Sequence, residues 1–353
     1  MLLAWGHSHR TTSDAELIRW GAPLGRVEGS VGPADGPLTT IEVALLREGG
    51  GGQRKRIRVN GLPRRAAGLA GLLRTVLFAP EEMLLIAGPP GLRRAEFDQL
   101  AGQRSPAYLH ELAAYGRTLQ QRNSLLRAIR EEQAGRAELR FWDRAFLDAG
   151  AAIVTERGRL LAALAEPLAR AHAEIAPDEA RTGRLGLRYE TNAAAQAGES
   201  ARDALERRLA ETADKEIWNG ATLVGPHRDD IVFEMGGRDL AGFASRGQQR
   251  TAILALKLAE LDLLAALDGR PPLLLLDDVF SELDPDRRSH LVRRISSLPQ
   301  AFVTTTALDD LDPELLHHAT AWQVSPGPAA GAGDEGAHLV GPRLAAGLTG
   351  DAG

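Results

Sequence analysis

The chain has 353 residues, of which 44% are hydrophobic, so it is long enough for a sizeable core and more than one structural unit. No stretch approaches the roughly 18 consecutive apolar residues of a membrane span, and no secretory signal pattern is present, so we expect a cytoplasmic protein without membrane contact. The lack of cysteine excludes disulfides and thiolate metal sites, and the net charge of −5 confines any nucleic-acid binding to a local patch.

The first half of the chain changes from β patterns to helical ones. Residues 39–59 alternate apolar and polar side chains around the glycine run 49–52, which predicts an antiparallel hairpin. The apolar run 73–78 predicts a buried strand. Leucines at helical spacing over 105–175 predict a separate helical lobe.

The second half alternates strands and helices. We expect a short strand at 185–189 and a helix at 201–218, capped by Ser200 with Asp203 in its first turn. A strand–helix–strand order with helices of the expected length predicts a right-handed parallel βαβ unit. From about residue 325, Gly, Ala and Pro predict a disordered tail. The expected elements of the last third are strands 231–233, 273–276 and 302–305 and helices 247–267 and 285–298.

Two aspartates follow four leucines at 273–276. This pattern predicts a buried strand that ends in carboxylates at the edge where open α/β sheets place ligands. Phosphoryl transfer uses one carboxylate to hold Mg²⁺ and a second to orient or deprotonate water. We assign Asp277 to the metal and Asp278 to the catalytic water. The alternative is that both simply face solvent or cap the next helix.

A second motif, S-x-G-Q, opens the apolar helix that precedes the leucine strand. It consists of Ser245, Arg246, Gly247 and Gln248. The free N–H groups at a helix start form an anion site. An ordinary serine cap is the alternative, and the position of the motif about thirty residues before Asp277 favours the anion site.

Together these segments resemble the ABC-type ATPases and, more narrowly, the RecF family of recombinational repair proteins. The resemblance extends from the first residues to about residue 306. Its most specific parts are G-P-H-R-D-D at 225–230 and the signature. The segments that carry it are 6–10, 17–19, 78–81, 121–123, 141–143, 225–230, 245–249 and 277–284.

The resemblance implies an α/β fold: an ABC-type ATPase head of mixed and parallel sheet with an inserted helical lobe. It implies ATP and Mg²⁺ as cofactors, an ATP-dependent homodimer, binding to single-stranded and gapped duplex DNA, support of recombinase loading, and RecR and RecO as partners. The signature residues would bind nucleotide. The D-loop would comprise Ser281, Glu282, Leu283 and Asp284.

The resemblance also suggests four segments. We expect the first part of the ATPase lobe at 1–100, a helical lobe at 101–218, the rest of the ATPase lobe at 219–324, and a disordered tail at 325–353.

No G-x-x-x-x-G-K-[ST] phosphate loop occurs in the sequence. Each of the three lysines, Lys55, Lys215 and Lys257, follows a residue other than glycine. The family pattern would place the loop and an N-terminal strand ahead of Met1. We therefore expect that this chain does not hydrolyse ATP alone. One hypothesis is an ATPase whose first segment is not shown, and the other is a nucleotide-incompetent relative that acts with an intact subunit.

Two basic groups have two interpretations each. His227 and Arg228 would contact DNA or nucleotide, or would belong to a structural ion-pair cluster with Asp229 and Asp230. The second group would bind DNA phosphates or would protect an exposed hairpin edge from aggregation, and we favour the second interpretation. Its members are Arg54, Lys55, Arg56 and Arg58.

Overall fold

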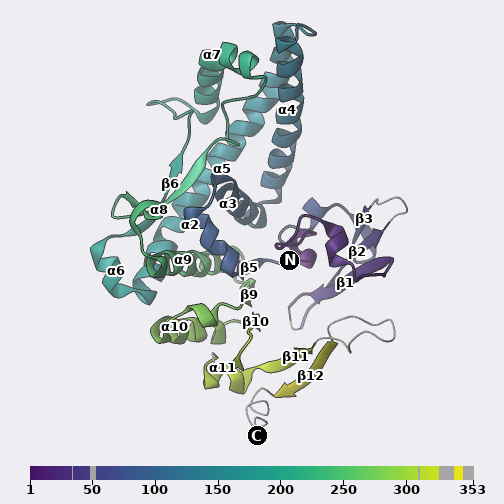
Figure 1. Cartoon of the computed structure of the whole chain (residues 1–353), viewed down its shortest axis with the longest axis vertical. Coiled ribbons are helices and arrows are strands. Elements are labelled where there is room, and N and C mark those ends of the chain that lie inside the picture. Colours follow the sequence, from purple (N-terminus) through teal and green to yellow (C-terminus); the bar gives the residue numbers. More distant parts are fainter. Residues whose placement is uncertain (34, 48–52, 309–310, 326–337, 345–353) are drawn as a thin grey trace. The chain divides into compact units, whose positions relative to one another are not determined.

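A computed structural model describes residues 1–33, 35–47, 53–308, 311–325 and 338–344 (Figure 1). The chain divides into two compact units. The first, which we call the head unit, combines Met1–Pro80 with Pro271–Gly353, and the second, the inserted unit, is Glu81–Arg270. The boundaries expected at residues 100 and 218 remain a prediction.

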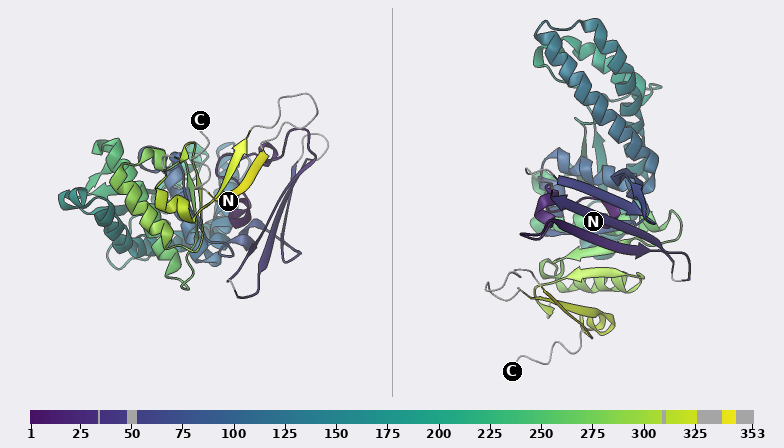
Figure 2. Two further views of the ribbon diagram at one scale, coloured as in Figure 1. Left: turned by 90° about the horizontal axis from the view of Figure 1, so that it is seen from below. Right: turned by 90° about the vertical axis from the view of Figure 1, so that its right-hand side faces the viewer.

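The head unit begins with an antiparallel sheet in the order β1-β2-β3-β4, drawn in purple in the right-hand view of Figure 2. One face of this sheet is apolar, because alternate residues of each strand point to the same side. It buries Ile41, Val43 and Leu45 of β2 and Ile57 of β3 in a common core. The strands are β1 (Leu24–Val31), β2 (Thr39–Arg47), β3 (Gln53–Val59) and β4 (Leu62–Arg64).

The hairpin predicted at 39–59 is confirmed by the pairing of β2 with β3. Its glycine run lies within 48–52, outside the described residues. The first strand, β1, was not predicted, since it contains two glycines and its apolar positions are widely spaced.

A parallel sheet in the order β10-β9-β5 forms the second part of the head unit. The helix α10 (Pro285–Ser296) connects β9 to β10 in the chain, which confirms the expected parallel strand–helix–strand unit. Within β9, Leu274 and Leu276 are buried, whereas Leu273 and Leu275 are half-buried. The strands are β5 (Thr75–Phe78), β9 (Leu273–Asp277) and β10 (Ala301–Thr304).

The remaining described elements of the head unit are short. Residues 338–344 form a strand paired antiparallel with β11, and Ser325 is the last residue of β11, although we expected a disordered tail from residue 325 onward; residues 326–337 and 345–353 of that tail lie outside the described ones. The elements are α1 (Leu2–Trp5), α11 (Pro313–His318), β11 (Thr320–Ser325), β12 (His338–Leu344) and 3₁₀ turns at Asp14–Leu17, Ala66–Leu69 and Phe280–Glu282.

The inserted unit is mainly helical, and α5 packs against α3, α4, α7 and α9 (Figure 1). This confirms the helical pattern seen over 105–175. The helices are α2 (Leu84–Ala87), α3 (Pro90–Arg104), α4 (Pro106–Arg130), α5 (Leu139–Ile175), α6 (Pro177–Thr182), α7 (Ala201–Asn219), α8 (Leu240–Phe243) and α9 (Arg246–Ala265), with a 3₁₀ turn at Arg136–Glu138 and another at Pro80–Met83 on the boundary.

The inserted unit also contains an antiparallel sheet in the order β6-β7-β8. The strand expected at 185–189 is β6 (Leu185–Glu190), and the one at 231–233 is part of β7 (Asp230–Met235), which pairs with β6 and with β8 (Arg238–Asp239). The cap of α7 is as predicted, because the Ser200 hydroxyl accepts from Asp203 N at 3.2 Å.

None of the described helices combines the length and the apolar character that crossing a membrane requires.

Candidate nucleotide site and its buried support

The carboxylate of Asp277 lies at the end of β9, where the parallel neighbour holds it in place. Thr304, directly opposite in the β10 register, donates from Oγ1 to Asp277 Oδ1 at 2.6 Å. Carboxyl ends of adjacent parallel strands meet at one sheet edge, so the contact follows from the register. Asp277 therefore keeps oxygen lone pairs available for a cation while one oxygen is fixed by the threonine.

The next residue, Asp278, has a left-handed backbone conformation with φ of 51°. Its backbone N–H donates to Thr304 O at 3.1 Å, and Ser281 Oγ donates to its carbonyl oxygen at 3.0 Å. Its Oδ1 is buried and has no hydrogen-bond partner within the described part of the chain. A non-glycine residue in this region costs on the order of 1–3 kcal/mol, and such residues concentrate at functional sites.

The predicted D-loop continues from Asp278 as the turn Phe280–Glu282 and leads into α10. Leu283 is buried and anchors the turn, while Ser281 is exposed. Asp284 caps α10 by accepting from Arg287 N at 3.0 Å, and it also pairs with the Arg287 guanidinium. Burial raises the pKa of Asp284, but these contacts from Arg287 outweigh it and leave the pKa below its ordinary value.

The signature residues form the exposed start of α9. The Ser245 hydroxyl accepts from Gln248 N at 3.2 Å, and Gln248 Oε1 accepts from Ser245 N at 2.9 Å, which completes a capping box. Ser245, Arg246 and Gly247 are exposed, whereas Gln248 is half-buried. The cap leaves further first-turn N–H groups without partners in the helix, so an anion can bind at this end.

Farther along α9, Lys257 is buried among three glutamates. Its Nζ lies 2.8 Å from Glu82 and 3.4 Å from Glu260, and it also pairs with Glu96. Burial raises the pKa of Glu260 well above its ordinary value, although the lysine opposes that shift. The cluster connects α9 to α3 and to the turn Pro80–Met83, and the Lys257 ammonium group is paired with the three glutamate carboxylates.

The G-P-H-R-D-D segment at 225–230 packs against α4 through a glycine. Gly225 has φ of +122°, and a Cβ there would lie 2.4 Å from the Tyr115 hydroxyl, so only glycine fits. The same hydroxyl lies 2.6 Å from His227 Nδ1, and His227 Nε2 lies 3.2 Å from Thr222 O. Burial, with the charge of Arg228, lowers the pKa of His227 to about 4, so the ring is neutral. Neutral His227 therefore accepts from Tyr115 and donates to Thr222.

The acidic end of this segment pairs with α3. Arg93 is buried and binds Asp230 through two contacts of 2.7 Å, while Arg94 donates to Asp229 O at 2.7 Å. Asp229 accepts from the Tyr189 hydroxyl at 2.6 Å. The exposed Arg228 instead donates to the Thr222 carbonyl. The Asp230 carboxylate thus takes its arginine partner from α3, which also binds the Asp229 backbone carbonyl, and the sequence pattern did not reveal this helix.

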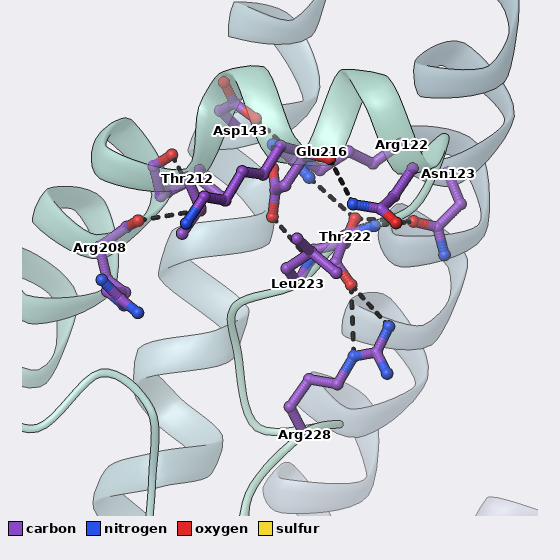
Figure 3. Close-up of polar contacts among 12 residues, drawn as sticks. Arg122, Asn123, Asp143, Arg208, Thr212, Glu216, Thr222, Leu223 and Arg228 are labelled. Atoms are coloured by element: carbon purple, nitrogen blue, oxygen red, sulfur yellow. Dashed lines mark hydrogen bonds and ion pairs between the residues drawn. The ribbon is translucent and has the colours of Figure 1, made fainter. Parts of the chain in front are cut away.

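A third cluster, shown in Figure 3, is centred on Arg122 of α4. Its guanidinium donates to Asp143 of α5 at 2.8 Å, to Glu216 of α7 at 2.7 Å and to the Thr222 hydroxyl at 2.8 Å. Asn123 Oδ1 accepts from both N and Oγ1 of Thr222 at 2.7 Å. Three segments that carried the resemblance, at 121–123, 141–143 and 225–230, therefore converge around one loop.

Sequence reasoning assigned no contact to Thr304, Tyr115, Arg93 or Glu216. The alignment of 302–305 beside 273–276 contained the signal for Thr304, because parallel strands of equal length bring their ends together. The other three residues contact their partners across more than 90 positions of sequence, and no local pattern reports such contacts. Signature and strand-end residues lie in different units, so each half of the candidate site is described by itself.

A parallel sheet ending in Asp277-Asp278, a signature helix and an inserted helical unit define an ABC-type ATPase fold. No protein-family model matches the chain. Curated relatives named DNA replication and repair protein RecF match nearly all of it. The relative from Geobacillus thermodenitrificans is 38% identical over 334 residues, covering 93% of this chain and 87% of the relative. The one from Bacillus subtilis is 37% identical, covering 92% and 87%.

Two solved structures of the recombination mediator protein RecF in the RecFOR pathway, described as RecF-ATPrS and RecF-ATP, are also similar. Each is 32% identical with a TM-score of 0.79; the first covers 88% of this chain and 82% of its own chain, and the second 87% and 81%. The chain belongs to the RecF family of DNA replication and repair proteins.

Proposed function

We propose that the chain takes part in recombinational DNA repair as a RecF protein: it binds single-stranded and gapped duplex DNA under the control of ATP, dimerises with ATP, and supports recombinase loading with RecO and RecR in the cytoplasm. The family membership and the RecF-ATP relative support this proposal. Asp277 would hold Mg²⁺, Asp278 would orient the attacking water, and the Ser245–Gln248 end of α9 would meet the γ-phosphate held by a second subunit.

The observation that carries the nucleotide part of the proposal is the geometry of Asp278. Its backbone has a positive φ, and its buried Oδ1 has no hydrogen-bond partner within the described residues. Both are accounted for if this carboxylate bonds to a water beside the cation on Asp277. Oxygen ligands from one or two carboxylates together with nucleotide phosphates are what Mg²⁺ takes in such sites, so the residues present fit this cofactor.

A second candidate function follows from the lysines. Lys55 pairs with Asp14 at 2.8 Å and donates to Gly6 O at 2.6 Å, Lys257 is held by glutamates, and Lys215 lies in the last turns of α7. None of them is placed in a phosphate loop. We infer that the chain as printed binds ATP weakly by itself and contributes its signature to a partner that carries the loop.

Sedimentation velocity with and without Mg-ATP tests both candidates. The chain alone should stay monomeric and should bind a fluorescent ATP analogue weakly. A form with a strand–loop–helix segment of sequence G-x-x-x-x-G-K-[ST] joined ahead of Met1 should dimerise with Mg-ATP. Ser245→Arg in that form should block dimerisation and spare nucleotide binding by the monomer.

Two outcomes contradict the assignments. Normal ATP-driven dimerisation of the Ser245→Arg form would remove the signature from the nucleotide site. Tight Mg-ATP binding by the printed chain alone would remove the second candidate function.

A further inference from the structure

The strongest local concentration of positive charge in the chain lies in the β3–β4 hairpin of the head unit. Residues 53–74 contain no Asp or Glu, whereas the whole chain has more acidic than basic residues, 47 against 42. The basic residues of this segment are Arg54, Lys55, Arg56, Arg58, Arg64, Arg65 and Arg74.

The strand β3 separates these charges onto two faces. Ile57 points into the core of the head unit, and Lys55, on the same face, binds Asp14 and Gly6 O. Since alternate residues point to opposite faces, Arg54, Arg56 and Arg58 stand together on the outer face, where all three are exposed. We call these three residues the β3 arginine row.

The side chains of the β3 arginine row are not engaged elsewhere in the described part of the chain. The register places Glu42 directly opposite Arg58, but Glu42 pairs with Arg26 of β1 at 3.1 Å, and Arg26 also pairs with Glu28. Arg26 pairs with both glutamates of the outer face, so four arginines stand against two glutamates there, and the described outer face keeps a net charge of +2. Three guanidinium groups remain on the sheet surface with no carboxylate between them.

Protection of a strand edge explains these charges only in part. The strand β4 pairs with Ile57, Arg58 and Val59, so the segment of β3 from Gln53 to Arg56 has no strand partner on that side among the described residues. A charge of either sign, or a mixture, discourages edge-to-edge pairing. An all-positive row in a chain of net charge −5 requires a further reason, and a polyanion supplies it.

The geometry of the row fits a nucleic-acid backbone. Alternate residues of a strand are about 6.8 Å apart, so the three arginines span about 14 Å. Phosphates of one DNA strand advance about 3.4 Å each along the helix axis, so neighbouring arginines of the row are about two phosphate steps apart and the row can contact three phosphates. Guanidinium groups bind phosphate oxygens through two parallel hydrogen bonds, which makes arginine suited to this contact.

The outer face also indicates which form of DNA it suits. Its described residues on β1 and β2 are Leu24, Arg26, Glu28, Ser30, Thr40, Glu42, Ala44 and Leu46. None of these is aromatic, and nor is any member of the row. Single-stranded DNA is usually held by bases stacked on aromatic rings, whereas duplex DNA is held without sequence preference through its phosphates.

We propose that the β3 arginine row binds the sugar–phosphate backbone of duplex DNA without sequence preference. This inference rests on the proposed DNA binding of the chain and assigns a surface to it. The β3 arginine row shares no residue with the candidate nucleotide site.

Fluorescence anisotropy of a labelled 30-base-pair duplex with the full chain tests the proposal. The triple variant Arg54→Gln, Arg56→Gln, Arg58→Gln should bind about 100-fold more weakly at 0.1 M salt, and the slope of log K against log salt should fall by about 2.7, or 0.9 per lost phosphate contact. The triple Arg→Lys variant at the same positions should keep most of the slope.

A matched control removes the same charge elsewhere. Arg136, Arg159 and Arg181 of the inserted unit are exposed arginines in surface ion pairs, so their triple change to Gln leaves the row intact. That control should bind the duplex within about twofold of the wild type. Circular dichroism and sedimentation velocity confirm that each variant is folded and monomeric.

The outcomes separate this proposal from the proposed function. If neither the wild-type chain nor its P-loop-carrying form with Mg-ATP binds duplex or single-stranded DNA, the proposed DNA binding fails and this inference fails with it. If the wild type binds the duplex and the Gln variant binds like the control, only the surface assignment is wrong. If the Gln variant lost only its binding to single-stranded DNA, the assignment of the row to duplex DNA would also be wrong. If the Gln variant aggregated while its monomer bound the duplex with unchanged affinity, the row would serve to protect the strand edge instead.

Discussion

The motif residues fall into two groups whose side chains differ in hydrogen bonding and in exposure to solvent. Asp277, Asp278 and Ser245 lie at element ends, where they are held by few contacts and partly or fully reach solvent. Arg122, His227 and the other residues of the second group lie in the inserted unit with nearly every polar atom paired. Both groups carried the resemblance. The difference supports our proposal that the first group acts on a ligand, whereas the second group holds the segment 220–230 in the inserted unit.

The buried group should give the largest loss of stability. Arg122→Met leaves Glu216, which is 0% exposed, without its cation. Removing one partner of a buried pair costs about 3–5 kcal/mol. We expect a loss of that size in the free energy of unfolding from urea titration. Arg117→Met, at an exposed position of the same helix, should change stability by less than about 0.5 kcal/mol. Equal losses of stability in the two variants would show that the Arg122 cluster contributes no more to the free energy of unfolding than an exposed arginine does.

His227 should make stability depend on pH. Its pKa is about 4 in the folded chain and ordinarily 6.5, so the unfolded chain binds more protons between these values. Stability is therefore complete above pH 6.5 and falls by up to about 2–3 kcal/mol as the pH drops toward 4. His227→Gln should flatten that part of the profile.

The exposed His110 of α4 provides the control for this pH dependence, since His110→Gln should leave the profile as in the wild type. A parallel profile for His227→Gln would contradict a neutral, buried imidazole.

The smallest expected effect distinguishes a serine that only caps its helix from a serine that also contacts nucleotide. Ser200 and Ser245 both form capping boxes, so Ser→Ala at either position should cost about 1 kcal/mol. Only Ser245→Ala should weaken ATP-driven dimerisation, measured by sedimentation in the form that carries a P-loop. If both variants dimerise alike, Ser245 is a cap and nothing more.

The sequence predicted local structure well where one pattern determined it. The β2–β3 hairpin, the Ser200 cap of α7 and the β9–α10–β10 unit follow from side-chain alternation, capping chemistry and strand–helix order. The strand β1 was missed because glycines weaken its pattern, and α3 was missed because Pro90 and five charged residues within its span obscure the helical period.

The site was harder to predict than the fold. Asp277, Asp278 and Ser245 were assigned from short motifs that mark element ends, which is where the structure has them. The partners of His227 and Asp230 come from α3, α4 and the Thr222 loop, and tertiary packing alone selects them. Sequence spacing therefore left the ion-pair and ligand interpretations of His227 and Arg228 open.

Comparison of Asp277→Asn with Asp230→Asn tests the division between the two groups most directly. Asp277 ends a strand beside one threonine, whereas Asp230 is bound by the buried Arg93 through two contacts. In a P-loop-carrying form, Asp277→Asn should abolish Mg-dependent ATP hydrolysis and change the free energy of unfolding by less than about 1 kcal/mol. Asp230→Asn should lose about 2 kcal/mol or more and, below its unfolding transition, still hydrolyse ATP. Full hydrolysis by Asp277→Asn, or loss of hydrolysis by a folded Asp230→Asn, would contradict the assignment.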